Sequence, residues 1–254
     1  GSTQEMYFSR RLRALGKMVY IGVEWIIGLR ANLFLRMPLS PNDYEREYIK
    51  ALRENHAEVL KLLKIEDKGL IKKVKTFAER NGISIKATIK KIVLDKTFRA
   101  IFARDPAKQK IHENIAAKYI KNIDGISNFH QLGHSELAIL RGAVLPYREV
   151  RKQGAAGRAK TLDFFWRFCG KEVYASHKYT RGKSGGAQGN QYKDIQEFVR
   201  EANESRRNNA YFVAICDGDF YQALDGGVSR LQRLKNLANN KNVFVFSLSD
   251  KGFI

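Results

Sequence analysis

The chain has 254 residues, and its 46 Lys and Arg against 26 Asp and Glu give a formal net charge of +20. A hydrophobic content of 44% excludes a disordered basic tail, because such a tail buries far less apolar surface. A folded protein this basic repels itself unless an anionic partner offsets the charge. Nucleic acid is therefore the leading partner, and a membrane surface is the alternative. Two cysteines are too few for a disulfide framework and indicate a reducing compartment.

No membrane-spanning segment is predicted. The most apolar stretch, residues 19–29, has about 11 residues and contains Glu24, whereas a spanning helix needs about 20 apolar residues. We interpret this stretch as a helix packed against protein.

Amphipathic helices are predicted over the first part of the chain, at residues 42–64, 69–80, 85–103 and 107–122. The first places Leu52, Val59 and Leu63 on one face, with Asn42 or Asp43 as its N-cap. We expect a mostly helical region over residues 1–140 that serves DNA binding or dimerisation.

Residues 141–254 have a different pattern. Strands are predicted at 161–168, 172–178, 211–216 and 243–248, with helices at 190–203 and 228–238 and a glycine-rich loop at 179–189. The first two strands form a hairpin across Cys169-Gly170-Lys171. The order strand, strand, helix, strand, helix, strand predicts an α/β fold with a mixed sheet flanked by helices.

Two charged residues in the hairpin are candidates for catalysis. Asp163 lies among apolar strand residues, where a carboxylate is costly unless it is paired or binds a metal. Lys178 ends the next strand, and adjacent strands lie about 4.8 Å apart, so the two side chains can converge on one phosphate. A carboxylate with Mg²⁺ and a lysine suits phosphodiester hydrolysis. A structural Asp–Lys pair inside the sheet is the alternative.

The run TLDFFW–CGKEVYASHKYT–RGKSGGAQGNQYKDIQEFVREAN–YFVAICDGDFYQ resembles the core of type II restriction endonucleases of the PD-(D/E)XK superfamily. The resemblance covers about 90 residues. It implies a mixed central sheet, with Asp163 as the metal-binding aspartate and Lys178 as the catalytic lysine. It further implies sequence-specific cleavage of double-stranded DNA with Mg²⁺ by a prokaryotic, cytoplasmic enzyme. A palindromic target would imply a two-fold homodimer.

One position departs from the family pattern. The second acid of the motif should stand two residues before the lysine, and Ser176 occupies that place. Serine does not replace a carboxylate as a magnesium ligand. Either the following helix supplies the acid, with Asp194 preferred to Glu197, or the protein binds without cutting. The resemblance also implies that Gln191 touches the scissile phosphate or the attacking water, and a solvated first-turn glutamine is the alternative.

Basic and amide side chains surround the predicted hairpin, as phosphate neutralisation and base reading require. The candidates for DNA binding are Arg148, Arg151, Lys152, Arg158, Lys160, Arg181, Lys183, Gln188, Asn190 and Lys193. Although Gly182-Lys183-Ser184 resembles the end of a P-loop, His177 stands where that motif requires its first glycine. No nucleotide cofactor is therefore expected.

Other polar residues are given structural roles. His177 should point to the sheet face opposite Lys178 and pack there. Asp217 and Asp219 are explained by a turn after a buried strand. His130 and His134 have helical spacing, but no cysteine lies nearby in sequence, so zinc is not expected. Two competing functions remain: a repair or structure-specific nuclease, and a non-catalytic DNA- or RNA-binding protein on the same fold.

Overall fold

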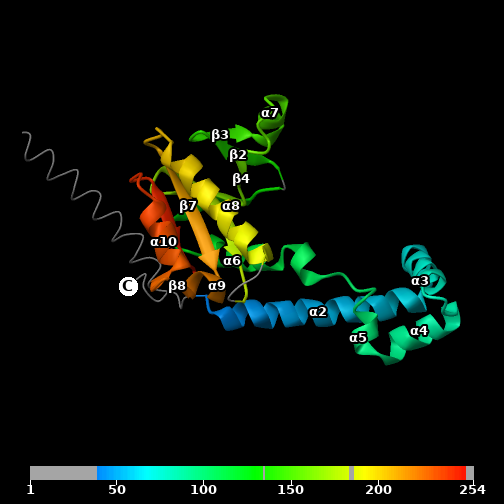
Figure 1. Ribbon diagram of the computed structural model, residues 1–254. Coiled ribbons are helices and arrows are strands. Elements are labelled where there is room, and N and C mark those ends of the chain that lie inside the picture. The colour runs from blue at the N-terminus through cyan, green and yellow to red at the C-terminus, as the bar shows by residue number, and fades with distance from the viewer. Residues whose placement is uncertain (1–38, 134, 183–185, 250–254) are drawn as a thin grey trace, which may run out of the picture. The chain divides into compact units, whose positions relative to one another are not determined.

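The computed structural model describes residues 39–133, 135–182 and 186–249, and element labels follow Figure 1. The helix expected at 19–29, His134 and Lys183 lie outside these residues. The chain divides into a helical unit, Ser40–Lys118, and a sheet-containing unit that includes residues from Tyr119 onward. No helix in the described ranges is long and apolar enough to cross a membrane.

The helical unit contains α2 (Pro41–Lys64), α3 (Lys68–Arg80), α4 (Ile85–Leu94), α5 (Lys96–Arg99), a 3₁₀ turn (Pro106–Gln109) and most of α6 (Ile111–Lys121). Ser40, rather than Asn42 or Asp43, caps α2: its hydroxyl accepts from the Asp43 N–H, and the Asp43 carboxylate accepts from the Ser40 N–H. The helix expected at 85–103 is divided, because the Asp95 carboxylate caps α5 by accepting from the N–H groups of Thr97 and Phe98.

The sheet-containing unit has strands β1 (Ile126–Gln131), β2 (Leu137–Leu140), β3 (Ala143–Pro146), β4 (Lys160–Thr161), β5 (Phe164–Phe168), β6 (Lys171–Tyr179), β7 (Ala210–Asp217), β8 (Leu224–Asp225), β9 (Val228–Ser229) and β10 (Val243–Phe246). Its helices are α7 (Tyr147–Lys152), α8 (Gly186–Asn203), α9 (Asp219–Gln222) and α10 (Arg230–Leu237). Strands β1 and β2, which fall within the region expected to be mostly helical, belong to this unit.

A mixed five-stranded sheet organises this unit, in the order β1-β5-β6-β7-β10. The β1–β5 and β5–β6 pairs are antiparallel, and the β6–β7 and β7–β10 pairs are parallel. Strands β2, β3 and β4 form a second sheet, and β8 and β9 form a short hairpin. The α/β class with a mixed sheet flanked by helices is therefore confirmed.

Helix α8 packs on one face of the large sheet (Figure 1), as its apolar spacing predicts. Ile195, Phe198, Val199 and Ala202 are fully buried and join a core with residues of β6 and β7. The helix begins at Gly186, so the expectation of a loop through residue 189 is wrong. Glycine disfavours a helix by about 1 kcal/mol per residue, and packing of the buried face offsets this cost.

Candidate active site

Asp163 lies in the short segment that connects β4 of the second sheet to β5 of the large sheet, rather than within a strand. Its backbone N–H donates to the carbonyl of Ala175 at 2.8 Å, so Asp163 adjoins the end of the β5–β6 ladder, where Phe164 pairs with Ala175. The half-buried carboxylate of Asp163 accepts through Oδ2 from the Ser176 hydroxyl at 3.3 Å and from the His177 backbone N–H at 2.8 Å. Among the described residues, Oδ1 has no hydrogen-bond partner.

Lys178 stands two residues beyond Ser176, near the end of β6. Because strand side chains alternate, Ser176 and Lys178 leave the same face of the sheet, and the contact with Ser176 places Asp163 there too. The neighbouring strand presents Ala214 and Cys216 on this face, next to the buried side of α8. In the described part of the chain, the half-buried Lys178 ammonium has no carboxylate within 4.0 Å, so it does not form the alternative structural pair with Asp163.

The two acids of α8 form ion pairs with a lysine and do not form a shared site with Asp163 in the described structure. The Lys160 ammonium lies 3.1 Å from the Asp194 carboxylate and also pairs with Glu197. Burial disfavours the charged form of Lys160, but hydrogen bonds from its ammonium to Glu197 and Asp194 outweigh burial, so its pKa is raised. Lys160, a candidate for phosphate contact, is thus held by two carboxylates on α8.

The residues present supply only part of a magnesium site. Asp163 offers one carboxylate with an uncommitted oxygen, and Mg²⁺ is often held by one or two carboxylates together with substrate phosphate and water. Asp194 and Glu197 are each engaged with the Lys160 ammonium through one carboxylate oxygen. Within the described ranges, no three His, Cys, Asp or Glu side chains already form a metal-binding cluster.

The start of α8 is attached to the end of β6. The buried Thr180 hydroxyl donates to Gln191 Oε1 at 2.5 Å, so Gln191 is not a solvated first-turn residue. Gly218, which follows β7, lies against Thr180: a Cβ at Gly218 would stand 2.2 Å from the Thr180 carbonyl oxygen, and its φ is +103°. Only glycine fits this contact. These contacts fix Gln191 near the strand end that carries Lys178.

A buried polar network occupies the opposite face of the same strands. His177 points there, as predicted, and its Nε2 lies 3.3 Å from Asp217 Oδ2. The fully buried Asp217 also accepts from the Ser247 hydroxyl and the Leu248 N–H, both at 2.7 Å. The turn interpretation of Asp217 is therefore wrong, because its carboxylate joins β6, β7 and the segment after β10. Its position at the end of a wholly buried strand was the available signal.

The other candidate DNA contacts are spread over several elements. Exposed positions are held by Arg148, Arg151, Lys152, Arg158, Arg181, Asn190 and Lys193. Gln188 is half-buried and donates to the Arg181 carbonyl at 3.3 Å. Asp219 accepts from the Gly182 N–H at 2.8 Å and so holds the beginning of the glycine-rich segment. His130 lies in β1 rather than on a helix.

Comparison of the chain with protein-family models, curated proteins and solved structures gave no match, so the interpretation depends on the geometry of these residues.

Proposed function

We propose that the protein is a magnesium-dependent endonuclease that cleaves double-stranded DNA. The observation that supports this most is the pair of hydrogen bonds by which Ser176 and His177 hold the Asp163 carboxylate, with Lys178 on the same side of the sheet as Ser176. The antiparallel hairpin followed by α8 and a parallel β7 also agrees with the resemblance to PD-(D/E)XK restriction enzymes.

In this proposal the chain's own groups have separate roles. Asp163 would hold Mg²⁺ through its carboxylate, while the Ser176 hydroxyl and the His177 N–H keep that carboxylate in place. A metal held there would supply Lewis-acid chemistry, polarising a phosphoryl oxygen and lowering the pKa of a water. The Lys178 ammonium orients the attacking water and stabilises negative charge that develops on the phosphate. Gln191 contacts the scissile phosphate or the water from the start of α8.

Substrate binding is assigned to the basic side chains around this site. Arg148, Arg151 and Lys152 on α7 and Lys193 on α8 are exposed and suited to backbone phosphates. We further propose that recognition is of a short specific sequence, and that two copies related by a two-fold axis match a palindromic site.

A non-catalytic DNA-binding role is the second candidate. Ser176 stands at the second-acid position, and both acids of α8 contact Lys160 instead of Asp163. This candidate predicts salt-sensitive DNA binding with no cleavage in Mg²⁺ or Mn²⁺.

Digestion of a long sequenced DNA with Mg²⁺ or with EDTA tests the proposal. We expect discrete fragments from the wild-type protein with Mg²⁺ alone, and a loss of at least about a hundredfold in rate for Asp163→Asn and Lys178→Met. Lys171→Met is the matched control, because Lys171 begins the same strand and its ammonium contacts the Asn208 carbonyl and the Tyr211 ring, away from Asp163. Cleavage that survives both active-site substitutions would refute the assignment, and binding without any cleavage would favour the second candidate.

A further inference from the structure

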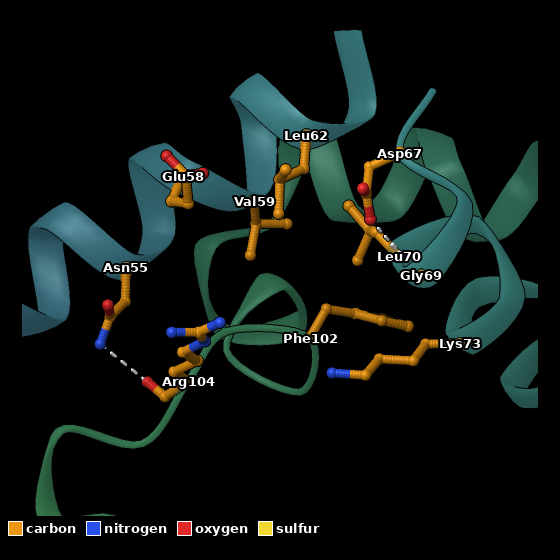
Figure 2. A pocket seen from close by; sticks show the side chains of 10 residues that line it. All are labelled: Asn55, Glu58, Val59, Leu62, Asp67, Gly69, Leu70, Lys73, Phe102 and Arg104. Carbon is orange, nitrogen blue, oxygen red and sulfur yellow. Dashed lines mark hydrogen bonds between the residues drawn. The ribbon is translucent and has the colours of Figure 1, made fainter. Parts of the chain in front are cut away.

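A hollow in the helical unit combines an apolar floor with two converging cations (Figure 2). It has a volume of about 470 Å³, within the range of about 300–1,000 Å³ for ligand sites. Val59, Leu70 and Phe102, which also belong to the core of this unit, form the floor. The side chains of Lys73 on α3 and Arg104 after α5 point toward the space beside Phe102 from opposite sides.

Two cations and two carboxylates line this hollow, and among the described residues no ion pair joins these cations to these carboxylates. Of the carboxylates, Asp67 caps α3 by accepting from the Leu70 N–H at 2.8 Å, and Glu58 lies 3.9 Å from Lys61. In the described chain, neither Lys73 nor Arg104 has a carboxylate within 4.0 Å. Two exposed cations therefore lie beside an apolar surface with no ion-pair partner in the described chain.

The cations continue beyond the first hollow. A second hollow shares Gly69, Lys73 and Phe102 with it and carries Lys72 and Arg80. Both are exposed, and neither forms an ion pair within the described ranges. A small anion needs one pair of cations, whereas a row of them matches the repeating phosphates of a nucleic-acid strand.

We propose that this face of the helical unit binds single-stranded nucleic acid, with one phosphate between Lys73 and Arg104 and its unpaired base in the apolar hollow. The amide of Asn55 also lines this hollow, but it donates to the Arg104 carbonyl at 3.0 Å and to Gln109 Oε1 at 2.7 Å, so the base contact is assigned to the apolar surface. This binding site is distinct from the proposed nuclease site, because none of its residues is assigned to DNA cleavage.

Binding of a labelled strand of about 12 nucleotides, measured by fluorescence anisotropy in EDTA, tests the phosphate contacts. We expect Lys73→Glu/Arg104→Glu to weaken binding by at least about tenfold and to lower the slope of log affinity against log salt by about 1.4. The matched control is Lys86→Glu/Lys90→Glu on α4, which makes the same charge change at exposed positions outside both hollows. Equal losses in the two double variants would overturn the proposal.

An abasic strand of the same length tests the base contact. The wild-type protein should prefer the base-containing strand, and Leu62→Trp, which fills the hollow, should abolish that preference while binding of the abasic strand is retained. Leu62→Phe serves if the tryptophan variant does not fold. No preference in the wild type, or better competition by an alkyl phosphate than by a mononucleotide, would overturn the proposal. EDTA suppresses metal-dependent cleavage, so failure of the nuclease proposal would leave this result unaffected.

Discussion

The carboxylate of Asp163 accepts a 2.8 Å hydrogen bond from the backbone N–H of His177. This contact joins the residue before β5 to the end of β6 without using a side chain of β6. The position of Asp163 is therefore set by backbone pairing, and it should survive substitution of Ser176. Ser176 can consequently be substituted to test whether the site accepts a metal.

Ser176→Asp should restore the acid-x-Lys pattern and make stability depend on metal. Ser176 is 4% exposed, and its hydroxyl contacts Asp163, so a second carboxylate there repels the first. We expect the free energy of unfolding in EDTA to fall by about 3 kcal/mol. A metal ion at a free concentration about a hundredfold above its Kd should raise the free energy of unfolding of this variant by about 2.7 kcal/mol.

Urea unfolding with EDTA, Mg²⁺ or Mn²⁺ measures this effect. Ser176→Asn is the control, because it has a similar size but adds no charge. If both variants respond equally to metal, the added carboxylate is not binding it.

The buried carboxylate of Asp217 should be among the groups on which stability depends most. Asp217→Ala leaves the Leu248 N–H and the Ser247 hydroxyl without their acceptor, and we expect a loss of about 3–5 kcal/mol. Ser247→Ala should cost about 1 kcal/mol. Asp219→Ala, which removes an exposed carboxylate two residues away, should cost less than about 1 kcal/mol. Equal urea midpoints for the Asp217 and Asp219 variants would contradict this prediction.

The ion pairs of Lys160 should make stability depend on alkaline pH. Its pKa is raised above the ordinary value of 10.5, so its contribution is complete below pH 10.5 and is lost as pH rises through the folded-state pKa. Both carboxylate partners are about half exposed, and the contribution is accordingly about 1 kcal/mol.

Lys160→Met reveals this dependence by difference. The gap in unfolding free energy between wild type and variant should be constant from neutral pH to about pH 10 and shrink above 10.5. A gap that persists at pH 12 would show that packing of the lysine stem, and not its charge, carries the stability.

Structural features that depend on local periodicity could be predicted from the sequence. The buried face of α8, from Ile195 to Ala202, follows from helical spacing, and the common face of Ser176 and Lys178 follows from strand alternation. Strand β1, with the sequence ISNFHQ, has no such signal, because its conformation is imposed by antiparallel pairing with β5.

Contacts between distant residues were beyond sequence reasoning. Lys160 and Asp194 are 34 positions apart, and no spacing rule relates a lysine in a two-residue strand to an acid on α8. Asp217 was missed because Asp-Gly after a strand also has a sufficient local explanation as a turn. The donors that complete its network come from the segment beyond β10.

Burial of His56 in the helical unit should lower stability in mild acid. His56 is 5% exposed, and neither ring nitrogen has a hydrogen-bond partner among the residues that the structure describes. Burial, followed by the charges of Arg99 and Lys96, lowers its pKa below the ordinary value of 6.5. The unfolded chain therefore binds the proton more readily, and stability falls as pH drops below 6.5.

His56→Leu should raise the unfolding free energy by about 1–2 kcal/mol at pH 8, because it removes an unsatisfied buried polar group. Its advantage over wild type should grow between pH 6.5 and pH 5 in urea titrations. A constant advantage across this range would mean that the imidazole does not titrate differently in the folded and unfolded chains.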